Sequence, residues 1–385
     1  MGMLMMNNGG SGTSSCIQPS PQVLASLPLL VYEYEDHPDA TTAPTAVVDP
    51  ADSTATAATT TTTTTKMLMY SLSERGIVYT HGSRPQMMDG NFCFSTPQGW
   101  LLILGQVSEA SLWHPLTGET ITLPPIHDDH YIPVNCKCLL THNSAAHPDC
   151  AVVLLDVTDP LMWFCRVNGG TDRRWGQHTY DIGDHDLPEE FRTPSTPTKN
   201  VIEDVAALRG KLHFNFTKSD QDKMGIIDLD FPSDHGHPPA AEFHEFDVSE
   251  LPEGMCSGSI YLVESMDELF AVCICCVDFD PSNIGAALIY RVDSSGEKPV
   301  AWHRVDDIGD RAFLLTDMNM ATWCFASTNN LKGNTLYFLK ELVAGNRDLC
   351  IYDIQEQTME IVQVHDQEDL EIVRTQPYWI NVPPC

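Results

Sequence analysis

Short apolar segments alternate with turn residues along most of this chain, from Met67 to Cys385. The clearest of them begin at a glycine and continue with strand-forming side chains, at residues 99–104, 210–216 and 333–338. Each is followed by a second strand-like segment, at residues 110–114, 224–229 and 348–353. One β-propeller blade typically begins with a glycine at a tight turn, which is followed by an inner strand, a hairpin and a further strand. The pattern therefore predicts a repeating all-β architecture.

The strand-like segments fall into five groups, at residues 76–126, 135–181, 201–248, 260–311 and 312–364. A last apolar segment, residues 378–382, is expected to close a ring beside the first strands of the domain. We therefore predict a single β-propeller of about five to seven four-stranded blades, preceded by a disordered N-terminal segment. A two-sheet sandwich is the competing architecture, but it uses fewer strands than the roughly twenty indicated by this pattern.

The N-terminal region has a different composition. Residues 1–22 are polar, and residues 39–65 are rich in Thr, Ala and Pro, with seven consecutive threonines from Thr59. Such segments bury too little apolar surface to offset the chain entropy lost on folding. Residues 1–66 are therefore predicted to be a disordered, low-complexity region with a candidate docking strand near residues 23–34. Residues 67–385 are predicted to be the propeller domain.

No targeting sequence is recognisable at the N-terminus. Residues 1–20 contain no Lys or Arg, which both a secretory signal and a transit peptide require. No apolar run in the chain approaches the length of a membrane span. We expect a cytoplasmic or nuclear protein that does not associate with a membrane.

The chain is strongly acidic, with a formal net charge of -32. Only six of the 53 acidic residues, and none of the 21 Lys and Arg, precede Lys66. A net charge of about -26 therefore lies in the predicted domain. A surface of that sign repels phosphate backbones and anionic lipids, which disfavours nucleic acid and membrane partners. It favours an unidentified protein partner with a basic segment, although solubility through self-repulsion also explains it.

The thirteen cysteines do not resemble a disulfide framework, because their number is odd and the chain is long. Many lie in apolar runs, where a free cysteine behaves as a small hydrophobic residue. Cys136 and Cys138, and likewise Cys273 and Cys275, place two thiols on one strand face, without the ligand spacing of a zinc site. The cysteines therefore predict a reducing compartment, and no metal or other cofactor is expected.

No catalytic motif is present, since the sequence lacks G-x-S-x-G, H-E-x-x-H, P-loop and G-x-G-x-x-G patterns. The paired carboxylates Asp278 and Asp280 are best explained as exposed strand ends. No catalytic residue is therefore predicted. Two proline-flanked loops contain closely spaced His and Asp side chains. Side chains of this kind can bind a divalent ion on a propeller face, although the ordinary composition of a loop also explains their presence. The candidate binding residues are His127, Asp128, His130, His235 and His237.

Several blocks of the chain, in a fairly specific order, resemble one known family. They are residues 99–104 followed by 112–125, then 307–313, 331–338, 349–353 and 377–380. Together they resemble the plant domain-of-unknown-function family 295, the KIB-type β-propeller domain, whose members often carry it behind an F-box. The resemblance covers about residues 67–384. One departure is His114 before Pro115, where the family has Asn, and a second is the lack of a recognisable F-box in residues 1–66.

The leading functional hypothesis is a non-enzymatic interaction module whose loop-rich face or central funnel recognises a protein partner. The resemblance alone implies an alternative, an F-box-type substrate receptor in ubiquitin ligation, but binding to a ligase adaptor is not expected without an F-box. A hydrolase or metal-dependent enzyme on the propeller face is a third hypothesis. It requires carboxylates or histidines that converge at one end of the funnel.

Overall fold

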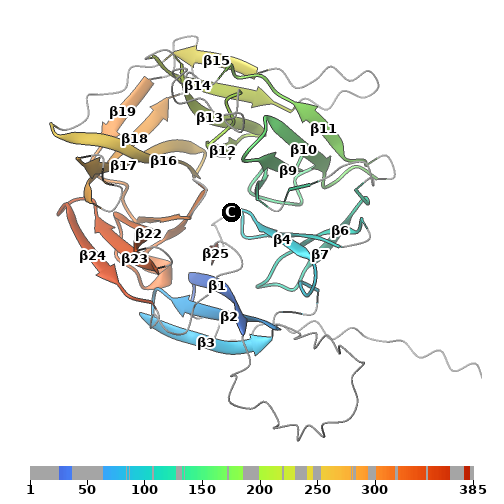
Figure 1. Cartoon of the computed structure of the whole chain (residues 1–385), viewed down its shortest axis with the longest axis horizontal. Helices are drawn as coiled ribbons and strands as arrows, with labels where there is room; N and C mark the ends of the chain where they lie inside the picture. Colours follow the sequence, from blue (N-terminus) through green and yellow to red (C-terminus); the bar gives the residue numbers. More distant parts are fainter. Residues whose placement is uncertain are drawn as a thin grey trace, which may run out of the picture.

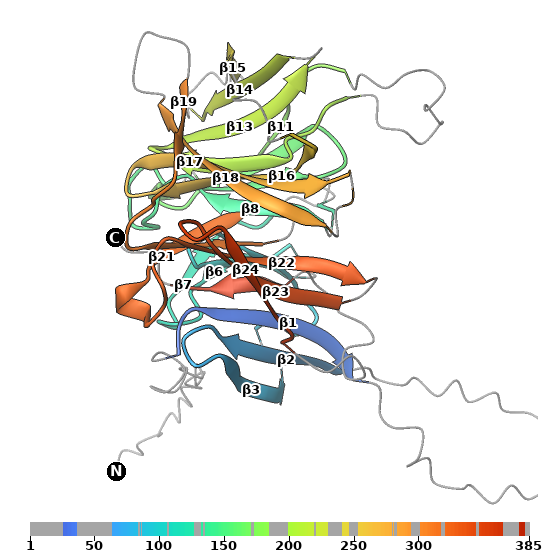
Figure 2. The same cartoon turned by 90° about the vertical axis from the view of Figure 1, so that its left-hand side faces the viewer.

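The structure is a computed structural model that describes residues 26–36, 64–83, 85, 87–105, 108–126, 132–133, 135–170, 173–184, 199–218, 221–229, 241–245, 253–278, 280, 283–293, 301–316, 320–343, 346–364 and 377–381. These residues form six β-sheets arranged around a common axis, like the blades of a propeller (Figure 1). The predicted all-β propeller is therefore confirmed, with six blades inside the predicted range of five to seven. Figure 2 shows the same ring from the side.

The first three blades each contain four strands. Blade 1 consists, from the axis outwards, of β25 (Tyr378–Ile380), β1 (Leu29–Asp36), β2 (Thr64–Ser71) and β3 (Gly76–Ser83). Blade 2 consists of β4 (Phe92–Ser95), β5 (Leu101–Leu104), β6 (Ala110–Trp113) and β7 (Thr120–Leu123). Blade 3 consists of β8 (Cys136–Leu140), β9 (Ala151–Asp156), β10 (Leu161–Arg166) and β11 (Gly176–Thr179).

The remaining three blades follow in chain order. Blade 4 consists of β12 (Asp204–Leu208), β13 (Lys211–Lys218), β14 (Gln221–Asp228) and β15 (Ala241–Glu245). Blade 5 consists of β16 (Met255–Ser265), β17 (Glu268–Val277), β18 (Ile284–Asp293) and β19 (Ala301–Val305). Blade 6 has five strands, in the order β21 (Ala321–Phe325), β20 (Arg311–Leu315), β22 (Thr335–Val343), β23 (Asn346–Asp353) and β24 (Thr358–Val362).

Among the described residues, Ser327–Asn329 forms a 3-10 turn. No helix of this part of the chain has the length and hydrophobicity needed to cross a membrane.

The position of a strand within its blade decides its burial. All six residues of β9 are buried, since both faces of that strand are covered by neighbouring blades. The outermost strand β24 instead contains only exposed and half-buried residues, because one edge and one face meet solvent. The uninterrupted apolar runs in the sequence are therefore strands from the middle of a blade.

The hydrophobic core of the ring is divided among the seams between blades. Each of the six apolar clusters formed by the described residues lies between two neighbouring blades. In the seam between blades 2 and 3, for example, Leu112 packs in one cluster with Leu154 and Trp163. Because each blade is sandwiched between two others, no blade can bury its apolar faces alone.

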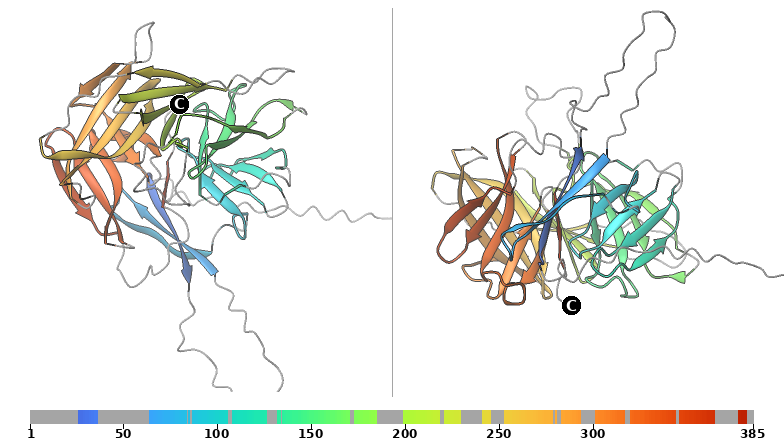
Figure 3. Two further views of the ribbon diagram at one scale, coloured as in Figure 1. Left: turned by 45° about the horizontal axis from the view of Figure 1, so that its top comes forward. Right: turned by 90° about the horizontal axis from the view of Figure 1, so that it is seen from below.

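Blade 1 closes the ring with strands from both ends of the described chain. The C-terminal strand β25 pairs antiparallel with β1, in the register Leu29–Ile380, Leu30–Trp379 and Val31–Tyr378. Figure 3 shows the blue strands of blade 1, β1 to β3, between blade 6 and blade 2. The predicted closure by the last segment is correct, although its partner is β1, which precedes the threonine-rich segment.

The domain boundary predicted at residue 67 needs correction for the same reason. Strand β1 pairs with both β2 and β25, so it is part of blade 1 rather than a segment docked on a finished ring. The strand β2 begins at Thr64, inside the threonine run. The rest of the predicted disordered region, residues 1–25 and 37–63, lies outside the described residues. Strand β3, which the pattern grouped with blade 2, also belongs to blade 1.

Blade 6 departs from simple up-and-down order. Its inner strand β21 follows β20 in sequence, and β22 then pairs parallel with β20 through Ala312–Thr335, Phe313–Leu336 and Leu314–Tyr337. The connection runs through the 3-10 turn. An insertion of this kind adds a fifth strand without breaking the seams on either side.

Candidate functional site

Polar contacts join the inner ends of the blades near the axis of the propeller. Thr322 in blade 6 donates a hydrogen bond from Oγ1 to the carbonyl oxygen of Pro97 in blade 2, at 2.6 Å. The side-chain amide of Gln98 donates to the carbonyl of Leu140 at 3.0 Å and accepts from its N–H at 2.9 Å. A cavity of only about 20 Å³ is left beside these groups, enough for about one water molecule.

A larger pocket opens near the axis on one face of the ring, and we call it the mouth pocket. Its volume is about 200 Å³. It is lined by blade 3 (Thr141, His142, Asn143, Ser144, His147), blade 4 (Ala207, Arg209) and blade 5 (Glu264, Asp267). Asn143, Ala207 and Glu264 also line the small cavity near the axis, so the mouth pocket lies next to it.

Two tight hairpin turns shape the rim of the mouth pocket. Arg209 and Gly210 connect β12 to β13, and Met266 and Asp267 connect β16 to β17. All four residues have positive φ, between 51° and 82°, which is the geometry of a type I′ turn. That turn favours Asn and Gly, so Met266 occupies a strained backbone position. With 55% of its surface exposed, Met266 also presents its side chain to solvent.

The carboxylate of Glu264 is the central polar group of the mouth pocket. Its Oε2 accepts a hydrogen bond from the side-chain amide of Asn143 at 2.9 Å, and its Oε1 accepts one from the N–H of Asp267 at 3.0 Å. Burial raises the pKa of Glu264 above its usual range, and the Asn143 hydrogen bond opposes this rise. Among the described residues, no Lys, Arg or His forms an ion pair with this carboxylate.

Two histidines form one wall of the pocket. The rings of His142 and His147 stack with centroids 3.8 Å apart and an interplanar angle of 10°. Burial, and then the neighbouring His147, lower the pKa of His142, so this imidazole is neutral at pH 7. The Nδ1 atom of His147 accepts a hydrogen bond from the N–H of Asp149 at 3.2 Å, which places its ring proton on Nε2.

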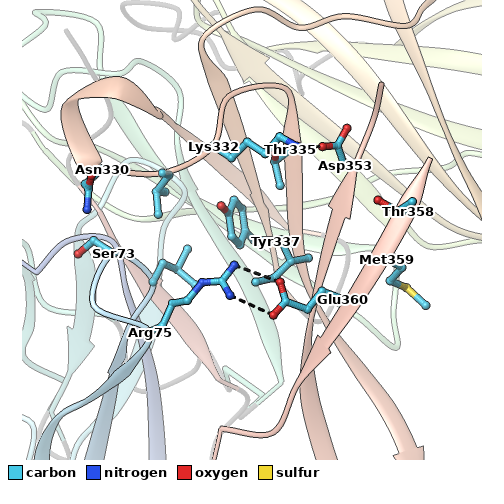
Figure 4. Close-up of a pocket in the computed structure, with 13 residues that line it drawn as sticks. Ser73, Arg75, Asn330, Lys332, Thr335, Tyr337, Asp353, Thr358, Met359 and Glu360 are labelled. Carbon is cyan, nitrogen blue, oxygen red and sulfur yellow. Dashed lines mark hydrogen bonds and ion pairs between the residues drawn. The ribbon is translucent and has the colours of Figure 1, made fainter. Parts of the chain in front are cut away.

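A second cavity, the seam cleft, lies between blades 1 and 6 and has a volume of about 320 Å³. Figure 4 shows Arg75 from the β2–β3 turn reaching Glu360 of β24, with its two guanidinium nitrogens 3.0 and 3.1 Å from the carboxylate oxygens. A second ion pair joins Lys332 to Asp353, and the ring of Tyr337 lies between the two pairs. Burial raises the pKa of Tyr337 to about 12, so its hydroxyl stays neutral.

The two cavities differ in how their charges are balanced. In the seam cleft each cation already has a carboxylate partner, so a charged ligand would have to displace an existing ion pair. In the mouth pocket, Arg209 lies nearest to Asp267, with Nε 4.0 Å from Oδ1, and Glu264 has no cation within the described part of the chain. An external cation would therefore gain more in the mouth pocket, because it would neutralise a half-buried charge.

The described residues contain no group of three or more His, Cys, Asp or Glu side chains that could hold a metal ion. The ten cysteines whose side chains are described are all free. Cys138 packs in the seam between blades 2 and 3, whereas Cys273 packs between blades 4 and 5, so the two thiol clusters are separated. Burial raises the pKa of Cys165 and Cys324 to about 12, which makes these thiols poor nucleophiles.

The candidate residues predicted from the sequence, His127, Asp128, His130, His235 and His237, lie outside the described residues. The carboxylates of Asp278 and Asp280 lie in the turn after β17 and are exposed, as expected for a strand end. Sequence analysis missed Glu264 because it ends an ordinary apolar strand. The available signal was the turn after it, where Met266 stands at a position that favours Asn or Gly.

Together the fold and its cavities define a six-bladed β-propeller with a pocket on one face. The sequence model of the KIB1-4 beta-propeller family matches residues 69–353. This chain therefore belongs to the KIB1-4 beta-propeller family, which confirms the resemblance inferred from its motifs. No curated protein matches the chain.

Several solved structures match parts of the chain at low identity. The N-terminal domain of Nup159 is 14% identical over 78% of this chain and 71% of that chain, with a TM-score of 0.25. The Cps50 (Swd1) β-propeller domain of Myceliophteria thermophila is 11% identical over 77% and 80%, with a TM-score of 0.35. The polysaccharide lyase Uly1 is 10% identical over 76% and 84%, with a TM-score of 0.30. At these identities and scores the likenesses carry no functional argument.

Proposed function

We propose that this protein is a non-enzymatic interaction module that binds a basic segment of a partner protein. The observation that carries the proposal is the large excess of carboxylates, a net charge of -32. A charge of this size attracts basic segments over distances of about 10 Å and speeds their encounter with the ring. The same charge disfavours nucleic acid and anionic membranes as partners.

The face that carries the mouth pocket is the best candidate for the binding surface. Turns from blades 3, 4 and 5 converge there, and loops held by a rigid scaffold are the usual place for recognition. The exposed side chain of Met266 supplies an apolar contact beside the polar pocket. A cytoplasmic or nuclear location is part of the same proposal, and free, buried cysteines suit the reducing conditions of either compartment.

Selection from a display library of random peptides tests this function while the partner is still unidentified. The full chain should enrich peptides rich in Lys and Arg at low salt. Their affinity should fall steadily as NaCl is raised, since added ions screen the attraction. Enriched peptides without an excess of basic residues, or an affinity that does not respond to salt, would contradict the proposal.

A further inference from the structure

Two shielded carboxylates elsewhere in the ring pair directly with a cation. Glu268 pairs with Arg311 at 2.6 Å, with side chains 35% and 17% exposed, and Asp353 pairs with Lys332. Glu264 has no such cation, since its two oxygens accept only from the Asn143 amide and the Asp267 N–H among the described residues. The buried Asp156 likewise accepts only from Thr158 and the Asp159 N–H within the described part of the chain. Glu264 lines the mouth pocket, however, and Asp156 does not. A carboxylate withdrawn from water without a cation costs stability, and neutral hydrogen bonds offset only part of that cost.

We propose that the mouth pocket is a binding site for one lysine or arginine side chain of the partner, with Glu264 as its counter-ion. This inference rests on the proposed function and specifies the chemistry of the site. The pocket's volume of about 200 Å³ is below the ~300 Å³ at which pockets for drug-sized ligands begin, so it suits a single long side chain.

The walls of the pocket match such a side chain. The stacked rings of His142 and His147 offer an aromatic surface against which a guanidinium or ammonium group can pack. Asn143 adds a side-chain carbonyl beside Glu264, and Ser144 adds a hydroxyl, so a cationic head finds acceptors on more than one side. The aliphatic stem of the ligand can contact Ala207, next to the small cavity near the axis.

The chain's own Arg209 does not already fill this role. Its guanidinium donates from Nη2 to the backbone carbonyl of Asp267 at 3.3 Å, and its side chain is 67% exposed on the rim. Gly210, the next residue, packs against the His142 ring, where an added Cβ would lie 3.0 Å from Cε1. The β12–β13 turn thus packs against His142, and Arg209 extends toward Asp267 on the rim of the mouth pocket.

The test compares the wild-type chain with two variants that lose the same charge. Glu264→Gln keeps the shape and hydrogen-bonding capacity of the side chain, so the fold should be retained. Glu253→Gln removes an exposed carboxylate in the turn before β16 and serves as the matched control. The probe is a fluorescent hexa-arginine peptide, and its dissociation constant is measured by anisotropy at low salt. Glu264→Gln should weaken binding about tenfold or more, whereas Glu253→Gln should change it less than about twofold.

The outcomes separate the pocket from the general function. If both variants weaken binding by the same small factor, the pocket inference is wrong while the proposed function stands. If the wild-type chain binds hexa-arginine no better than a hexa-glutamate peptide, the proposed function itself fails. A second readout is the NMR signal of the His142 ring, which should shift when hexa-arginine saturates the wild type. An unperturbed His142 signal at saturation would also overturn the pocket inference.

Discussion

His213 lies on the face of blade 4 that packs against blade 5, and it is almost fully buried. Within the described part of the chain, its Nδ1 atom has no hydrogen-bond partner. Burial, followed by the charges of Lys211 and His244, lowers the pKa of His213 to about 4. The histidine is therefore neutral in the folded protein at any ordinary pH.

The buried His213 should make the ring sensitive to acid. In the unfolded chain the histidine takes up a proton near pH 6.5, whereas the folded protein resists protonation down to about pH 4. Because the unfolded state binds the additional proton, stability falls as the pH drops through this window, by up to about 3 kcal/mol. Urea unfolding at several pH values should show a shallower pH dependence for His213→Leu than for the wild type. Identical slopes for the two proteins would show that His213 is not the responsible group.

The turn between β4 and β5 contacts the chain just after β25, the strand that closes the ring. Gly99 has φ +81°, and a Cβ placed there would lie 2.5 Å from the carbonyl oxygen of Asn381, just after β25. Asn381 in turn donates a hydrogen bond from Nδ2 to the carbonyl of Trp323 in β21, at 2.6 Å. The absence of a side chain at Gly99 therefore lets blade 2 approach the closing strand of blade 1.

Substitution of Gly99 by Ala should destabilise the protein through two effects, the positive φ and the clash with Asn381. Gly118→Ala isolates the first effect, since Gly118 has φ +71° and no atom within 4 Å of an added Cβ. Gly99→Ala should cost about 1–3 kcal/mol more than this control, as expected when a side chain is forced into a packed site. Thermal or urea unfolding measures the difference, and equal losses for the two variants would contradict a steric contact at the closure.

At the scale of the whole molecule, the ring is held shut by the short strand β25. Trp379, in the middle of this strand, is 4% exposed and packs in the seam between blades 6 and 1. Its indole N–H donates a hydrogen bond to the carbonyl of Leu315 in blade 6, at 3.1 Å. The ion pair between Arg75 and Glu360 spans the same seam, but both side chains are more than half exposed, so it adds less than about 1 kcal/mol. Apolar burial at Trp379 is thus the larger contribution to closure.

Trp379→Ala should therefore weaken the ring as a unit. Removal of a buried tryptophan costs about 3–5 kcal/mol, which is a large share of the stability of a typical domain. The matched variant is Trp302→Ala on the outer strand β19, where the side chain is only half-buried and the loss should be smaller. Urea unfolding gives the two losses, and small-angle scattering reports whether the ring opens. A loss at Trp302 as large as at Trp379 would argue against closure through β25.

The family, the all-β class and the approximate blade number could be predicted because they depend on local patterns. Each hairpin keeps its apolar residues and turn glycines within a few tens of residues, as in the strands that start at Leu101, Lys211 and Thr335. Blade 1 could not be assembled in this way, since Leu29 pairs with Ile380 across almost the entire chain. For the same reason Glu264 was missed, because its pocket combines turns from three blades.

The sequence alone determined the strands, their turns, the acidic charge and the need of each sheet for neighbours that cover its apolar faces. These properties follow from side chains close together in the chain, where alternation and turn chemistry act directly. Only the tertiary structure decided which strand closes the ring, that Gln98 and Thr322 link different blades near the axis, and that Glu264 is half-buried with no cation among the described residues. Burial and charge compensation depend on groups brought together by the seams, and no local pattern records which blades will meet.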